Sequence, residues 1–144
     1  MCIAASVACG SREPPGATVV FVCEHGSAKS VVAAALFNDL SAKRALPFRA
    51  VSRGLDPDPV LAPAVMRGLA SDGLVPPAQL PIRLTAEDKL ASRVVFLGDG
   101  RRELGPHGET WAAIPAVSES YAASRDAIRT RINTLLDQLS VENR

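Results

Sequence analysis

The chain has 144 residues, of which 47% are hydrophobic and 22% charged, and its formal net charge is +1. This length suits one compact domain with its own core, and the near-neutral charge argues against nucleic-acid binding through bulk positive charge. No apolar run approaches the roughly 20 residues that a membrane-spanning helix needs. All three cysteines lie within residues 1–23, so we expect neither a disulfide framework nor a metal site with separated ligand pairs.

Residues 1–16 differ in composition from the rest of the chain. A short apolar stretch ends at Cys9, and turn-forming residues follow as far as Gly16. We interpret 1–16 as a leader or linker and 17–144 as the folded domain. The stretch that ends at Cys9 partly resembles a truncated signal of a bacterial lipoprotein. We expect a cytoplasmic bacterial protein, and the alternative is a membrane-anchored lipoprotein lipidated at Cys9.

The rest of the chain alternates between predicted strands and predicted helices. β-branched and aromatic runs predict buried strands at 18–22, 48–52 and 94–97, and helical spacing of apolar residues predicts helices at 30–43, 60–71 and 118–139. The pair Thr85 and Asp88 is typical of an N-cap that begins a short helix, and a Gly-rich loop is expected at 98–109. This alternation favours an α/β fold with a small parallel sheet covered on both sides. In such sheets ligands bind beyond the carboxyl ends of the strands.

The loop after the first strand combines a thiol with features of an anion site. Cys23 ends the strand, and Lys29 and Ser30 begin the helix that follows. The free N–H groups and the dipole at a helix start favour negative charge, which would include a thiolate. The competing interpretation is an inert buried thiol. A nucleotide-binding P-loop is excluded, because its two glycines would fall at Cys23 and Ala28.

Several segments in order resemble the low-molecular-weight protein tyrosine phosphatases and the related arsenate reductases. Residues 23–30 resemble the family's phosphate loop, in which a Cys is followed by five residues, Arg and Ser. Segments 51–54, 84–85, 94–97 and 111–115 resemble the Ser-Ala-Gly, Leu-Thr, third-strand and Trp-containing segments of the family. The resemblance implies a flavodoxin-like parallel four-stranded sheet flanked by helices.

The same resemblance assigns roles to the residues of the loop. Cys23 would be the nucleophile, Ser30 the hydroxyl that stabilises its thiolate, and Lys29 the cation of the anion site. The remaining loop residues would surround the anion; they are Glu24, His25, Gly26, Ser27 and Ala28.

This sequence departs from the family pattern at three positions. Lys29 replaces an Arg and so lacks the planar two-point grip of a guanidinium, and Gly26 replaces an Asn. Ile114 precedes Pro115 where the family has the Asp that protonates the leaving oxygen. Loss of a general acid typically slows a reaction by about 10² to 10⁴, so slow phosphoester hydrolysis is expected. Glu119 is the nearest carboxylate of that segment, although a helix-start acid is the better reading of it.

Other residues are candidates for lining a pocket. Asp99 follows the third strand, and Trp111 and Tyr121 are aromatic residues that can flank a site or cover the core. We expect Arg101 and Arg102 to keep their loop solvated; the alternative is that they extend the positive potential of the site.

These residues favour a cysteine-dependent enzyme that acts on a phosphate-like oxyanion. Its reaction would be phosphomonoester hydrolysis, with a phosphorylated protein among the candidate substrates, or arsenate reduction. No cysteine follows Cys23, so arsenate reduction would need a small-molecule thiol as co-substrate; no other cofactor and no metal is expected. The alternative function is a catalytically weak phosphatase-like module that binds an anion or a phosphorylated partner.

Overall fold

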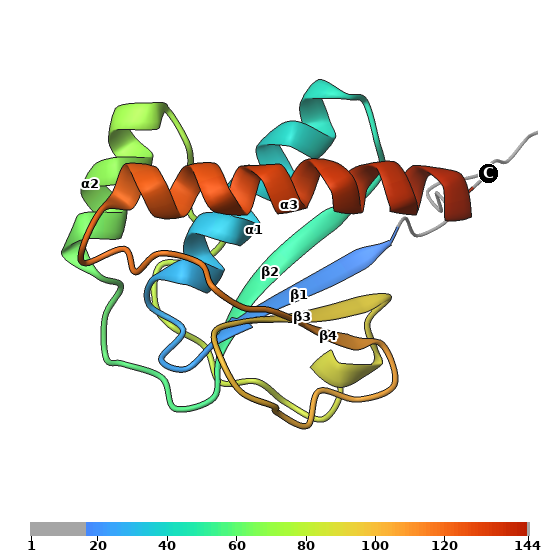
Figure 1. Cartoon of the computed structure of the whole chain (residues 1–144), viewed down its shortest axis with the longest axis horizontal. Coiled ribbons are helices and arrows are strands. Elements are labelled where there is room, and N and C mark those ends of the chain that lie inside the picture. The colour runs from blue at the N-terminus through green and yellow to red at the C-terminus, as the bar shows by residue number, and fades with distance from the viewer. Residues whose placement is uncertain (1–16, 144) are drawn as a thin grey trace, which may run out of the picture.

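The computed structural model describes residues 17–143 and contains a four-stranded parallel sheet in the order β2-β1-β3-β4 (Figure 1). The predicted fold class is confirmed. The segment 1–16 predicted as a leader or linker, including Cys9, lies outside the described residues. The elements are β1 (Thr18–Cys23), α1 (Lys29–Lys43), β2 (Arg49–Gly54), α2 (Pro63–Asp72), the 3-10 helix η2 (Asp88–Leu90), β3 (Arg93–Leu97), β4 (Gly108–Trp111) and α3 (Tyr121–Glu142).

The two faces of the sheet are covered differently. Because side chains alternate along a strand, Val19 and Phe21 of β1 face α1, α2 and α3, which all pack on the same side (Figure 1). Val20 and Val22 point to the other side, where they form a smaller cluster with Leu104 and with loop residues. Strand β1 is therefore buried on both faces, which explains its continuous apolar sequence.

The predicted bounds of two elements differ from those in the structure. A loop was expected at 98–109, but the strand β4 already begins at Gly108 and pairs with β3 at the edge of the sheet. Helix α3 begins at Tyr121, three residues later than predicted, because the Ser120 hydroxyl accepts a hydrogen bond from the Ala123 N–H at 3.1 Å and caps the helix there. The predicted Thr85 cap is confirmed by a reciprocal pair of hydrogen bonds with Asp88, at 2.9 and 3.1 Å.

The strand order creates the opening in which a site can form. Strand β1 lies between β2 and β3, so the chain leaves β1 and β3 toward opposite sides of the sheet. The loops that follow these two strands separate at the carboxyl edge, and a crevice is expected between them.

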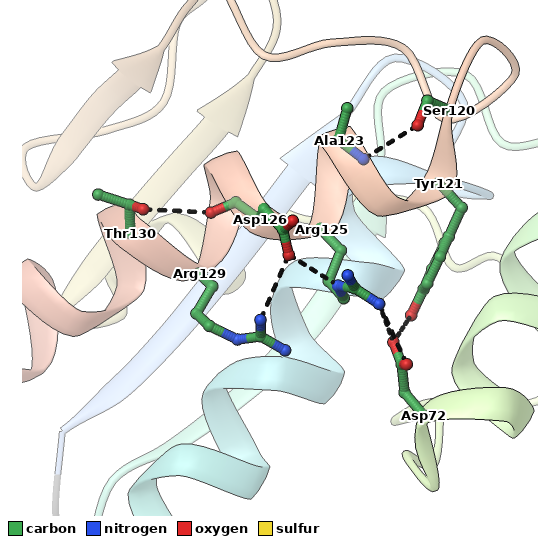
Figure 2. Close-up of polar contacts among 8 residues, drawn as sticks. All are labelled: Asp72, Ser120, Tyr121, Ala123, Arg125, Asp126, Arg129 and Thr130. Atoms are coloured by element: carbon green, nitrogen blue, oxygen red, sulfur yellow. Dashed lines mark hydrogen bonds and ion pairs between the residues drawn. The ribbon is translucent and has the colours of Figure 1, made fainter.

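A polar network joins the end of α2 to the start of α3 (Figure 2). The Tyr121 hydroxyl donates to Asp72 Oδ2 at 2.9 Å, and Arg125 Nη1 donates to both oxygens of Asp72, at 3.1 and 3.0 Å. Gly68 leaves room for the Tyr121 ring, since a Cβ there would lie 2.5 Å from ring atoms. These contacts fix the first turn of α3 against α2.

We predict that Asp72→Asn destabilises the fold in a pH-dependent way. Partial burial alone raises the pKa of Asp72, but hydrogen bonds from Tyr121 and Arg125 lower it more, so the net pKa lies below its ordinary value. A lowered pKa in the folded state gives stability that is present above the unfolded-state pKa of about 3.9 and is lost as the pH falls through the folded-state value. Urea unfolding should show a loss of about 1 kcal/mol at pH 7 that shrinks below about pH 4.

The matched control for this prediction is Asp137→Asn. Asp137 also pairs with an arginine, Arg44, but its side chain is 73% exposed, and such surface pairs contribute little. Equal losses in the two variants at pH 7 would contradict the role given to Asp72.

Candidate active site

The thiol of Cys23 lies at the carboxyl end of β1 and contacts the first turn of α1. Its Sγ donates a hydrogen bond to Ser30 Oγ at 3.1 Å, and Ser30 is completely buried. A serine hydroxyl can rotate to donate as well as accept. If Cys23 ionises, the Ser30 hydroxyl is therefore placed to donate its proton to the thiolate, and a hydrogen bond to a charged group is worth about 1.5–3 kcal/mol.

The carbonyl groups of the loop at 23–28 point toward the segment at 55–62. The carbonyls of Cys23, Glu24, His25 and Ser27 accept hydrogen bonds from the N–H groups of Leu55, Asp56, Asp58 and Ala62, at 3.2, 2.7, 3.0 and 3.0 Å. In a trans peptide the N–H group points opposite to the carbonyl. The N–H groups that follow these carbonyls therefore face away from 55–62, and none of them donates to a backbone carbonyl within the described residues. Such a row of free N–H groups forms an anion-binding concavity.

The shape of this loop depends on two glycines that contact each other. Gly26 has a positive φ of 62°, and a Cβ on it would lie 2.9 Å from Cα of Gly54 at the end of β2. A Cβ on Gly54 would lie 2.6 Å from N of Gly26. Asn tolerates the left-handed region better than most residues, so the same conformation accounts for the Asn of the resembling family at this position.

Two loop side chains tie the loop to the segment after β2. Ser27 Oγ donates to Asp58 Oδ2 at 2.7 Å, and His25 Nδ1 lies 3.0 Å from the Asp56 carbonyl oxygen. The hydrogen bond to this carbonyl, together with the nearby charge of Asp58, raises the pKa of His25 above its ordinary value. Both contacts hold the loop in the conformation that its glycines allow.

A cavity of about 550 Å³ opens above Cys23. Its walls come from the 23–29 loop, the start of α2, the residues that follow β3, and the segment before α3. Small or apolar side chains line most of it, including Ala62, Pro63, Phe96 and Val117. Its charged lining residues are Glu24, Lys29, Asp99 and Arg102. An apolar cavity with a few convergent polar groups is typical of a small-molecule site.

The predicted pocket residues separate into two groups. Asp99 lines the cavity, and its Oδ1 accepts a hydrogen bond from the Ala113 N–H at 3.3 Å. Trp111, Glu119 and Tyr121 do not line it. Trp111 points from β4 into the core, with its ring 5.6 Å from that of Phe21; Glu119 is exposed in a turn, and Tyr121 belongs to the network of Figure 2.

Ile114 packs in the hydrophobic core at 6% exposure. The position before Pro115 thus serves packing and offers no proton to the cavity. Asp99 is the carboxylate of the cavity that contacts this segment, through its hydrogen bond with Ala113.

Arg102 is exposed, as expected, and it also lines the cavity. Its Nη2 donates to Glu24 Oε1 at 3.1 Å, and its Cζ lies 5.0 Å from the centre of the Phe96 ring. One feature of the sequence favours this position. Arg102 lies in the loop that follows β3, and in a parallel sheet this loop begins at the same edge as the loop that follows β1.

Two further expectations concern the whole described chain. Within residues 17–143, no group of three or more His, Cys, Asp or Glu side chains is placed to hold a metal ion. In the same range, no helix is both long enough and apolar enough to cross a membrane.

Solved structures with the same architecture come from several bacteria and an archaeon. YfkJ from Bacillus subtilis superposes with a TM-score of 0.80 at 19% identity, over 93% of this chain and 100% of that one. Low-molecular-weight phosphotyrosine phosphatase from Vibrio cholerae O395 gives 0.74 at 15% identity, over 87% and 97%. The chain has the low-molecular-weight phosphatase fold.

An arsenate reductase shares this fold as well. The enzyme from Archaeoglobus fulgidus superposes with a TM-score of 0.66 at 25% identity, over 83% of this chain and 98% of that one. No family model and no curated protein matches the sequence. The similarity to the phosphatases and arsenate reductases that short motifs indicated is therefore found by comparison of the three-dimensional structures.

We predict that Gly26→Ala costs more stability than Gly73→Ala. Both glycines have positive φ, at 62° and 72°, so both substitutions strain the backbone by a similar amount, about 1–2 kcal/mol. A Cβ at Gly73 meets nothing within 4 Å, whereas at Gly26 it would overlap Gly54. Thermal unfolding should therefore give a distinctly lower Tm for Gly26→Ala, and equal Tm values would contradict the close packing of Gly26 on Gly54.

Proposed function

We propose that this protein is a cysteine-dependent enzyme that acts on a phosphate-like oxyanion, with Cys23 as the nucleophile. The observation that carries the proposal is the 3.1 Å contact between Cys23 Sγ and Ser30 Oγ at a cavity toward which free loop N–H groups can point. A buried thiol that only fills space needs neither a hydroxyl partner nor an adjoining anion concavity. Lys29, which also lines the cavity, adds positive charge to bind the oxyanion.

In phosphomonoester hydrolysis, the Cys23 thiolate would attack phosphorus and the bond from phosphorus to the ester oxygen would break. The phosphoryl group is then held on sulfur, and the leaving oxygen takes a proton. Water next attacks phosphorus, which releases inorganic phosphate and returns the thiolate. The Ser30 hydroxyl stabilises the thiolate at the start and at the end of this cycle.

Asp99 is our candidate for the proton donor in this cycle. It is one of two carboxylic acids that line the cavity, and the other, Glu24, is paired with Arg102. The hydrogen bond from Ala113 holds Asp99 beside the segment of Ile114, where the resembling family carries its acid.

Arsenate reduction is the second reaction that the same site supports. The Cys23 thiolate would attack arsenic(V) and displace water, which leaves arsenate bound to sulfur. A small-molecule thiol then attacks the Cys23 sulfur, so that two sulfurs are oxidised to a mixed disulfide and arsenic is reduced to arsenite, which leaves. A second thiol restores Cys23. This route needs no proton donor for an ester oxygen, which agrees with the apolar Ile114.

A non-catalytic anion-binding module is the competing function. The buried Ile114 and the replacement of the loop arginine by Lys29 favour it. Such a module would have no use for a nucleophile, so covalent chemistry at Cys23 separates the two.

We predict a covalent adduct on Cys23. The full chain is incubated with an aryl phosphate or with arsenate, quenched in acid, and analysed by peptide mass spectrometry. A phosphoryl or arsenic adduct should appear on the Cys23 peptide and be absent from Cys23→Ser. If wild type binds phosphate but never forms an adduct with either reagent, the binding module is the correct function.

We also predict that Asp99→Asn slows phosphoester hydrolysis according to the leaving group. A poor leaving group such as an alkyl oxygen needs the proton, so kcat should fall by about 10²-fold, whereas an activated aryl leaving group should be much less affected. Glu119→Gln is the matched control because Glu119 lies outside the cavity. An equal loss for both leaving groups would exclude proton donation by Asp99.

A further inference from the structure

The anion site has a positive charge from its loop but no guanidinium in that loop. Lys29 lines the cavity and forms no ion pair within residues 17–143. An ammonium group is a point charge, whereas a guanidinium can donate two parallel hydrogen bonds to two oxygens of one oxyanion. A guanidinium at the cavity, in addition to Lys29, would therefore increase the affinity for an oxyanion and fix the orientation of its oxygens.

Arg102 brings a guanidinium to the same cavity from the loop that follows β3. Its Nη2 donates to Glu24 Oε1 at 3.1 Å, and Glu24 directly follows Cys23 in the chain. Arg102, Glu24 and Cys23 all line the cavity. The guanidinium thus already contacts a carboxylate, a planar anion, at the cavity that Cys23 also lines.

The position of this guanidinium does not depend on Glu24 alone. Arg102 Cζ lies 5.0 Å from the centre of the Phe96 ring, which is within cation–π range. Phe96 is 2% exposed at the end of β3, and a Cβ on Gly98 would lie 2.9 Å from its ring. The missing side chain at Gly98 therefore leaves space for the ring that supports Arg102.

The ion pair with Glu24 is open to exchange. The side chains of Arg102 and Glu24 are 38% and 47% exposed, and ion pairs with such exposure are worth about 0.2–1 kcal/mol. An oxyanion with two negative charges, held by the loop N–H groups and Lys29, offers Arg102 a stronger partner than a half-exposed carboxylate does.

We propose that Arg102 binds the oxyanion in the Cys23 cavity together with Lys29, and that it exchanges the Glu24 carboxylate for this anion. The proposal rests on the proposed function of Cys23 and deepens it. It makes the site selective for a tetrahedral oxyanion that presents at least two free oxygens, and it gives Glu24 the role of an internal anion that occupies Arg102 when the cavity is empty.

The test is titration calorimetry of the full chain with inorganic phosphate at pH 7 and fixed salt. Arg102→Ala should raise the Kd for phosphate about tenfold, because it removes a charge-assisted pair of hydrogen bonds. Arg102→Lys should recover only part of the affinity, since it restores the charge without the planar fork. Arg102 is exposed and its ion pair with Glu24 is weak, so these variants should fold, with only a small decrease in Tm from the lost surface contacts.

The matched control is Arg101→Ala, because Arg101 is an exposed neighbour that does not line the Cys23 cavity. Its Kd should equal that of wild type. The proposal is overturned if Arg102→Ala binds phosphate as wild type does, if Arg101→Ala loses as much affinity, or if Arg102→Lys binds fully. If wild type itself does not bind phosphate, both the proposed function and the role of Arg102 fail. If wild type binds phosphate but the Arg102 variants bind it equally well, only the role of Arg102 fails.

Discussion

The direct packing of Gly26 on Gly54 is the constraint from which the rest of the site follows. With no Cβ on either residue, the loop after β1 lies against the end of β2 at backbone distance. At this distance four loop carbonyls find donors in the 55–62 segment. The N–H groups that follow these carbonyls are then directed away from that segment. The anion concavity is thus a consequence of how two backbones cross.

The charges around the cavity make it different from a simple copy of the family's site. The positive charge is divided between Lys29 on α1 and Arg102 on the loop after β3, and the acids Glu24 and Asp99 line the same cavity. Glu24 and Arg102 form an ion pair with each other. Binding of a dianion would change this balance, so its affinity should decrease with ionic strength more than the folding stability does.

The parts of the site that were predictable from sequence are those fixed by local interactions. The turn after β1 and the Thr85 cap each depend on residues a few positions apart, and the resemblance of the Cys23 loop lies in one short segment. The sequence could not decide between solvation and the site for Arg102, because its position at the cavity depends on a partner, Glu24, that is 78 residues away in sequence. The sequence left Trp111 open between the pocket and the core, because β4 is short and has only one buried residue, so its apolar pattern is too weak to reveal a strand.

The proposed reactivity of Cys23 depends on the hydrogen bond between its Sγ and the Ser30 hydroxyl. The most direct measurement is the rate of alkylation of Cys23 by iodoacetamide at pH 7, in a background with Cys2→Ser and Cys9→Ser, so that a single thiol remains. Ser30→Ala should slow alkylation about tenfold, which is the size expected for a lost hydrogen bond to a charged sulfur, while Ser140→Ala on α3 should leave the rate unchanged. Equal rates with and without the Ser30 hydroxyl would contradict the account.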